Sequence, residues 1–248
     1  MTSRAHTGPA APPGTSHGRR PAVLPAVWPA VCGVLAALLQ LDFLLELVLP
    51  GGPPVARSQI SELSAPGQPG AWLFRLLDVL SGLLVLALVP GWWRASRTVA
   101  TCLAVWGLGL ALSAVSSASC ADSLHPRCDG NGLPGPHTSL RDNLHDVGST
   151  LSALALLLGI AVAAAALRRH GEVRRGAWVG ALTLLAVLLG LEETVEDLVG
   201  TSSGRGISQR LQVVVLSAVL LLLADPRHWP GAGRRPLSPR SSRSPSGS

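Results

Sequence analysis

The sequence contains no lysine and no tyrosine, and only 14% of its 248 residues are charged. Without lysine the chain cannot form a Walker A loop, and it also has no HExxH helix, so neither phosphate-loop nor zincin chemistry is supported. Such a low charge beside a hydrophobic content of 48% excludes an ordinary soluble domain. Because the apolar residues form blocks close to the length of a bilayer-spanning helix, we predict an integral membrane protein.

The positive charge of the chain comes from arginine alone. All 20 basic residues are arginines, and the formal net charge is +6. They lie mostly between the apolar blocks and near the ends of the chain, which indicates membrane topology rather than a nucleic-acid-binding face. The expected partner is therefore the lipid bilayer, with no nucleic acid. A lysine-free composition rich in alanine, glycine, proline and arginine is typical of a GC-rich genome, so we predict a protein of a bacterial plasma membrane.

Six apolar runs predict an all-α bundle of six transmembrane helices. The expected helices cover Val27–Leu49, Ala71–Pro90, Val99–Ala118, His145–Leu167, Ala177–Val199 and Ile207–Ala224. Together they form one transmembrane domain over residues 23–224. Residues 1–22 and 225–248 are rich in proline, serine, glycine and arginine and show no apolar period, so we expect both to be disordered tails. A cleaved signal at the first run is the alternative, but no small-residue cleavage site follows it.

The arginines also predict which side of the membrane each loop occupies. Fourteen of the 20 lie in the two tails and in the links after the second and fourth helices, against six on the other side. Because cytoplasmic loops carry the excess of positive charge, both termini are predicted to be cytoplasmic. Twelve of the 14 acidic residues, all except Glu172 and Asp225, then lie on or near the outer side.

A polar segment, Cys120–Ser149, separates the third and fourth helices on the predicted outer side. It holds three of the seven histidines and four acids, so we expect chemistry or recognition there first. Cys120 and Cys128 lie in this oxidising location, which favours a disulfide, with thiolate metal binding as the alternative. Cys32 and Cys102 lie within apolar runs and are expected to pack as small apolar side chains.

The candidate residues of this segment also have ordinary structural interpretations. His145, at the start of the fourth helix, could meet interfacial water, bind a metal or handle a proton. Asp122, just after the third helix, could fix a turn or take part in a site. His125 and His137 in the loop could simply be solvated. Asp142 is expected to cap the N-terminus of the fourth helix.

Acidic residues inside the apolar runs require partners. Glu46 and Asp78 lie deepest, and each needs a neutralising neighbour. The end of the fifth helix carries four acids, whose repulsion must be relieved by a cation, by protonation or by water. We expect Arg210 to pair with one of them and Arg75 with another, as a structural brace; solvated acids and a cation or substrate site are the alternatives. The four acids are Glu192, Glu193, Glu196 and Asp197.

Short motifs in this chain resemble those of a known family. Over about residues 57–223 their order is similar to a family of bacterial and archaeal integral membrane proteins called domain of unknown function nine-nine-eight. The resemblance implies a membrane fold of about six helices and assigns no activity. The residues that carry it are Ser61-Glu62-Leu63 with Pro66-Gly67 before the second helix, Asp122 after the third, His145 opening the fourth, and Gln209-Arg210 opening the last.

A more distant likeness concerns mechanism. An aspartate after one helix and histidines at helix ends on one face also look like the alkaline ceramidases and related membrane hydrolases, which bind zinc through three histidines beside a serine and an aspartate. The likeness implies a zinc site that includes Asp122, His125 and His145. The chain lacks the HxxxH helix that this superfamily has near its end, so another ligand must come from His137, Glu192 or Glu196.

Two functions follow from these features. The first is a non-enzymatic membrane protein for transport, sensing or assembly, with an outer cluster of Asp, His and Glu side chains. The alternative is a metal-dependent hydrolase that acts on a lipid or peptide at the outer leaflet. Six helices without a clear internal repeat suit a secondary transporter best as a homo-oligomer. If the outer acids are held in ion pairs with arginine, Arg210→Ala should harm stability more than His145→Ala. If they form a zinc site, the His145 variant should lose the metal.

Overall fold

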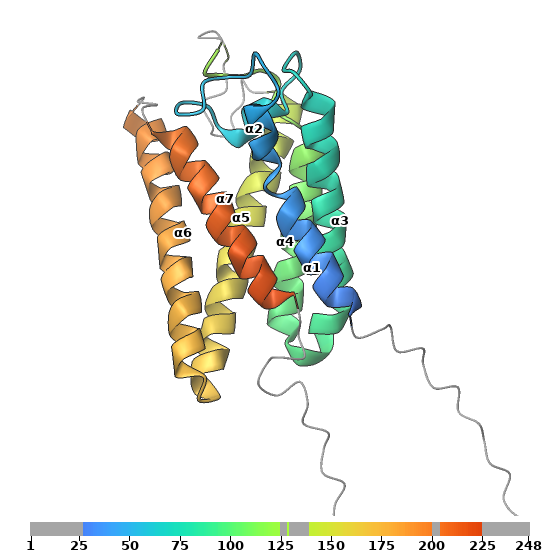
Figure 1. Cartoon of the computed structure of the whole chain (residues 1–248), viewed down its shortest axis with the longest axis vertical. Coiled ribbons are helices and arrows are strands. Elements are labelled where there is room, and N and C mark those ends of the chain that lie inside the picture. Colours follow the sequence, from blue (N-terminus) through green and yellow to red (C-terminus); the bar gives the residue numbers. More distant parts are fainter. Residues whose placement is uncertain (1–26, 125–127, 129–138, 200–203, 225–248) are drawn as a thin grey trace, which may run out of the picture.

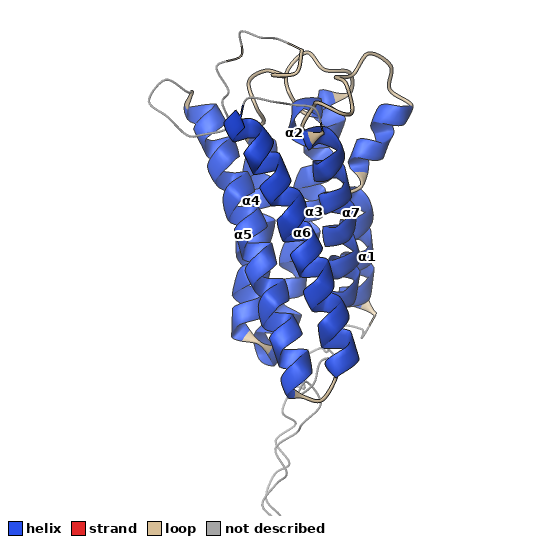
Figure 2. Ribbon diagram, turned by 90° about the vertical axis from the view of Figure 1, so that its left-hand side faces the viewer, coloured by secondary structure: helices blue, strands red, loops and turns tan. Residues whose placement is uncertain are grey.

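The computed structural model describes residues 27–124, 128, 139–199 and 204–224, which form a helical bundle (Figure 1). No strand occurs among these residues, so the predicted all-α class is confirmed. The long helices run side by side, and a short helix, α2, lies at one end of the bundle (Figure 1 and Figure 2). In chain order the elements are α1 (Trp28–Leu39), the 3₁₀ helix η1 (Asp42–Leu47), α2 (Ile60–Leu63), α3 (Ala71–Ala95), α4 (Arg97–Val115), α5 (Leu140–Arg169), α6 (Val173–Val199) and α7 (Arg205–Leu223).

Five helices in the described part, α3 to α7, are long and apolar enough to cross a membrane. The prediction of a continuous first helix over Val27–Leu49 is wrong, because α1 ends at Leu39 and the chain continues as η1. An apolar run indicates burial in the bilayer but does not determine which backbone hydrogen bonds form inside it. The interruption falls where polar Gln40 and Asp42 enter the run. The predicted tails, residues 1–22 and 225–248, lie outside the described residues.

Helix α5 begins at Leu140, earlier than the predicted start at His145. Ser139 is the N-cap residue, and its hydroxyl accepts a 3.1 Å hydrogen bond from the Asp142 amide. The prediction that Asp142 caps this helix is therefore corrected: Asp142 occupies the first turn, where a carboxylate is favoured by the helix dipole. The earlier start places His145 more than one turn inside the helix, between its neighbours rather than at its exposed end.

Glycines allow α4 to approach its neighbours closely. A Cβ atom on Gly109 would lie 2.6 Å from the carbonyl oxygen of Gly148 in α5, and one on Gly107 would lie 2.7 Å from that of Gly82 in α3. Small residues at such crossings are typical of helices that pack within membranes. The close approach of α4 to α5 brings Ser113 beside His145.

The two ends of the bundle differ in polarity. Figure 1 shows that α1 begins and α7 finishes at the same end, opposite α2. Near that end Trp92 is fully buried, and its indole Nε1 donates a 2.8 Å hydrogen bond to the Leu223 carbonyl. At the α2 end, by contrast, the buried side chains include Ser58, Glu62 and Arg210. A functional site is therefore to be sought at the α2 end.

Candidate functional site

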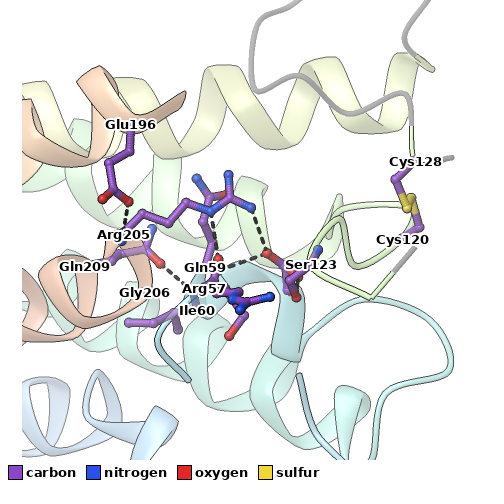
Figure 3. A network of polar contacts seen from close by, with 12 residues as sticks. Arg57, Gln59, Ile60, Cys120, Ser123, Cys128, Glu196, Arg205, Gly206 and Gln209 are labelled. Carbon is purple, nitrogen blue, oxygen red and sulfur yellow. Dashed lines mark hydrogen bonds and ion pairs between the residues drawn. A yellow bond between two sulfur atoms is a disulfide. The ribbon is translucent and has the colours of Figure 1, made fainter. Parts of the chain in front are cut away.

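The carboxylate of Glu62 holds α2 over the bundle and is itself buried, at 3% exposure. It closes a capping box by accepting a 3.0 Å hydrogen bond from the backbone N–H of Gln59. Its second oxygen accepts from both the backbone N–H and the hydroxyl of Ser123, in the segment after α4. Arg205 Nη2 lies 3.5 Å from the first oxygen (Figure 3). Glu62 thus joins α2 to the exit of α4 and to the start of α7.

Two acids of α6 fix the position of α7. The Glu196 carboxylate accepts from the backbone N–H groups of Gly204, at 3.1 Å, and Arg205, at 2.7 Å (Figure 3). These amides have no partner inside the helix, and the helix dipole favours a negative charge beside them. One turn later, Gln209 donates to Glu193 at 3.0 Å and accepts from the Ile60 backbone N–H. The two acids therefore have structural contacts with α7.

Arg210 forms a buried ion pair with Glu46. Its Nε and Nη2 groups donate to the two carboxylate oxygens at 2.7 and 2.6 Å, and both side chains are less than 10% exposed. Such paired, parallel hydrogen bonds are the strongest form of this interaction. The remaining guanidinium nitrogen, Nη1, donates to three backbone carbonyl groups, those of Val55, Ser58 and Gly206.

The predicted pairing of Arg210 with an acid of α6 is therefore wrong. Adjacent residues of a helix point in different directions, so Gln209 reaches α6 while Arg210 reaches η1. The deep acid Glu46 does have the partner that its burial requires. Arg75 likewise contacts no α6 acid in the described part, and its Nε donates to the Ser64 carbonyl at 2.7 Å.

His145 is 8% exposed, and its ring is held by Ser113 of α4. The Nδ1 atom lies 2.9 Å from the Ser113 carbonyl oxygen and 3.0 Å from the Ser113 hydroxyl. Because a carbonyl oxygen can only accept, the shorter contact assigns the ring proton of neutral His145 to Nδ1. Nε2 is then the acceptor that a ligand can use.

Asp142 ties the start of α5 to the segment after α4. Its carboxylate accepts from the backbone N–H of Ser119 at 2.8 Å, from the Ser119 hydroxyl at 3.0 Å and from the Ser139 hydroxyl. Arg141 adds a second link, because its Nη2 donates to the Ser117 hydroxyl at 2.6 Å. These contacts bring the walls of a cavity together.

The outer chamber, as we name this cavity beneath α2, has a volume of about 220 Å³. It is lined by several serines, by His145 and by five acidic side chains, and no arginine of the described residues lines it. A cavity with this lining attracts positively charged ligands. The acidic side chains are those of Glu62, Asp122, Asp142, Asp146 and Glu193.

A second cavity of about 200 Å³, the inner chamber, reaches further between the helices. Its polar lining includes Asp42 of η1 and Asp78 of α3, beside apolar residues of α4, α5 and α7. The two chambers are neighbours, and His145 lines both. The residues that line both are Ser61, Ser113, His145, Ser149 and Gln209.

A family model described as protein of unknown function (DUF998) matches residues 30–225. The chain belongs to this family. No curated protein and no solved structure matches it. In this DUF998 protein the polar residues on which the resemblance rests lie at one end of the bundle, although they are far apart in the sequence. Arg210 forms the buried ion pair, and the outer chamber is lined by Ser61, Glu62, Asp122, His145 and Gln209.

The predicted disulfide of the DUF998 protein is confirmed, with the Cα atoms of Cys120 and Cys128 6.2 Å apart. Cys32 and Cys102 are free and buried. Among the described residues, one group of three potential metal ligands has its ligand atoms within 4.8 Å of one another, namely the two bonded cysteines and Asp122. Zinc binds thiolates, and sulfurs joined in a disulfide are not thiolates, so this group does not fit zinc.

The other predicted zinc ligands are not brought together in the described part of the DUF998 protein. Glu192 is exposed and lines neither chamber, while Glu196 binds the amides of α7. His125 and His137 lie outside the described residues. Asp122 and His145 do line the same chamber, which leaves them as candidates for binding a ligand other than zinc.

Three residues of the site are not among the candidates predicted from the sequence. Gln40 and Asp42 line the inner chamber, and the available signal was the occurrence of two polar side chains within the first apolar run. Ser113, which orients His145, has no such signal, because small hydroxyl residues are common in membrane helices. Their roles become visible only when α4, α5 and η1 are packed together.

Proposed function

We propose that this protein crosses a bacterial plasma membrane six times and that its outer chamber binds a small cationic solute for transport or sensing, without enzymatic chemistry. The observation that carries the proposal is the chamber's lining, with five acidic side chains and no arginine among the described residues. The nearby Arg210 is bound to Glu46 and lines neither chamber. Arg205 lies 3.5 Å from Glu62, one of the five acids.

The size and hydrogen-bonding groups of the outer chamber suit an organic ammonium ion. Its volume of about 220 Å³ exceeds the roughly 150 Å³ of an engineered cavity that binds benzene. Carboxylates bind ammonium groups through charge-assisted hydrogen bonds. The Nε2 atom of His145 supplies a further acceptor. The half-buried Asp146 and Glu193 are the acids that we expect to contribute most.

A six-span topology with cytoplasmic termini is supported by three observations. α1 and η1 together rise about 30 Å, the thickness of the hydrocarbon core. The start of α1 and the end of α7 share one end of the bundle. The arginine-rich links after α3 and α5 lie at that same end, which the positive-inside rule assigns to the cytoplasm (Figure 2).

Reporter fusions test this topology. Alkaline phosphatase folds only outside the cytoplasm, so we expect a fusion after Ser248 to be inactive in cells and an insertion within residues 130–136 to be active. An insertion after Arg97, the first residue of α4, is the internal control and should be inactive. Activity at Ser248 and Arg97 with none at residues 130–136 would reverse the proposed orientation.

Ligand-induced stabilisation tests the proposed binding. We expect the melting temperature of the purified protein to rise with small organic ammonium ions and not with sulfonates of the same size. A ligand at 100 times its Kd should stabilise the protein by about 2.7 kcal/mol. Asp146→Asn and Glu193→Gln should each weaken binding several-fold, because each removes a negative charge from the lining.

Glu172→Gln is the matched control for these variants. Glu172 is exposed at the opposite end of the bundle, in the link between α5 and α6, so its loss should leave the stabilisation unchanged. Equal stabilisation by ammonium and sulfonate ions would contradict a cation-binding chamber. One equivalent of zinc in the wild-type protein, lost in His145→Ala, would instead make the metal-dependent hydrolase the leading function.

A further inference from the structure

The first membrane helix is interrupted beside the inner chamber. α1 ends at Leu39, and Asp42 begins η1. The hydrogen bonding changes here, because the Gln40 N–H donates four residues back, to Ala36, whereas the Leu41 N–H donates three residues back. In transporters, interrupted helices hold coupling ions near the middle of the bilayer. The interruption places Asp42, which is 6% exposed, in the wall of the inner chamber.

Helix α3 brings a second carboxyl group to the same wall. The Ser81 hydroxyl donates to the Ala36 carbonyl at 3.1 Å, which fixes α3 against α1. Asp78 lies one turn before Ser81, toward the interruption, and lines the inner chamber with Asp42. Both side chains therefore border the same space of about 200 Å³. No salt bridge in the described part of the chain includes either of them.

The surrounding elements do not neutralise this pair. From η1, Glu46 follows Asp42 by four residues, but its carboxylate is already bound to Arg210 of α7. From α5, His145 is the one titratable side chain that lines the chamber. The residues that α2, α4 and α7 contribute to the lining are all neutral. Two neighbouring carboxylates in such surroundings require a positive charge between them.

Gln40 supplies an independent sign of a ligand. Its amide nitrogen is buried without a hydrogen-bond partner, and the residue lines the inner chamber. Because a half-turn exchanges the two ends of an amide, Gln40 can offer its oxygen to an ion or its N–H to a water bound to that ion. Across the chamber, Gln212 donates its Nε2 to the Ala186 carbonyl, which leaves its oxygen as the available atom.

We propose that the inner chamber binds one monovalent cation, a proton or a sodium ion, between the carboxyl groups of Asp42 and Asp78. Both ions supply the single positive charge that relieves the repulsion of this pair. A proton does so by neutralising one carboxyl group, and sodium does so by accepting carboxylate and amide oxygens as ligands. The inference goes beyond the proposed function, because this ion is distinct from the solute of the outer chamber and would couple its binding to an ion gradient.

The test uses the full-length protein, purified in detergent at neutral pH. Binding of radioactive ²²Na⁺ is measured at constant ionic strength, set with potassium chloride. The infrared carbonyl band of a protonated carboxylic acid is recorded on the same protein without sodium. We expect either one sodium ion per chain or a protonated carboxyl group, and we expect Asp42→Asn and Asp78→Asn each to abolish that signal. Glu172→Gln should leave it unchanged.

The wild-type measurement decides the outcome even where a variant does not fold. Wild-type protein with neither bound sodium nor a protonated carboxyl group overturns the proposal, and so does a signal that persists in both folded variants. Stabilisation by organic ammonium ions is measured separately and reports on the outer chamber. Failure of the inner ion site is therefore distinguishable from failure of the proposed function.

Discussion

We expect Arg210→Met to lower the free energy of unfolding by about 3–5 kcal/mol, the effect of removing one partner from a buried ion pair. The Arg210 and Glu46 side chains are 8% and 7% exposed, so water cannot solvate the carboxylate that remains. The variant also leaves three backbone carbonyl groups without the donor that Nη1 provides. Because two of these belong to the connector between η1 and α2, the position of α2 should become less well defined.

The matched control is Arg175→Met, the same substitution in an exposed pair. Arg175 lies 3.9 Å from Glu172, and their side chains are 65% and 49% exposed. Exposed pairs of this kind contribute about 0–1 kcal/mol, so this variant should unfold close to the wild-type temperature. Thermal unfolding of both purified variants makes the comparison. It is monitored by a thiol probe, which reacts with the buried Cys32 and Cys102 when the protein unfolds.

A double variant separates the charge from the packing. Glu46→Gln combined with Arg210→Met removes the unpaired carboxylate and should recover part of the lost stability. His145→Ala should cost less than Arg210→Met, because it removes contacts to Ser113 without leaving a buried charge. Equal melting temperatures for Arg210→Met and Arg175→Met would show that the ion pair does not stabilise the fold.

The helical class and the five long helices could be predicted because each depends on a local property. A run of about 20 apolar residues favours a helix in lipid whatever its neighbours are, since lipid offers no partner for a free backbone group. The interruption of the first run could not be predicted in this way. The Val27–Leu49 run is apolar enough for one helix, and the change at Gln40 depends on contacts with α3 and α7.

The partners of the charged residues were harder to predict than the helices. Glu46 and Arg210 are separated by 164 positions, and the sequence offered the acids of α6 as nearer partners. Which partner is chosen depends on the rotation of α7 about its axis, which is set by packing. The sequence did predict the end of the bundle at which the candidate residues lie. Twelve of the 14 acids fall on or near the side of the membrane that the arginine count assigns to the outside.

Glu62 and Arg210 together hold α2 and the connector that precedes it in place over the two chambers. Glu62 binds α2 to Ser123 and Arg205, while Arg210 binds the preceding connector to Glu46. Figure 3 shows how Glu196, Arg205 and Gln209 bring the start of α7 into the same network. Glu62 and Gln209 also line the outer chamber, so this network forms part of the chamber's wall.

We expect Glu62→Ala to lower the free energy of unfolding by about 2–3 kcal/mol and to loosen the disulfide segment. The substitution removes the acceptor of the Gln59 amide and of both Ser123 donors, and it leaves Arg205 without this carboxylate. Hydrogen bonds to a charged group contribute about 1.5–3 kcal/mol, and buried donors left without an acceptor add to the cost. The melting temperature of the purified variant measures the first effect.

The rate at which a dithiol reduces the Cys120–Cys128 disulfide measures the second effect, because Ser123 lies between the two cysteines and is held by Glu62. Reduction should be faster in Glu62→Ala than in the wild type, and Glu62→Gln, which keeps one acceptor oxygen, should lie between them. Glu192→Ala is the control, since Glu192 is an exposed acid outside both chambers and should change neither measurement. A Glu62→Ala protein that melts and is reduced like the Glu192 variant would show that α2 is held in place by its apolar contacts and not by this carboxylate.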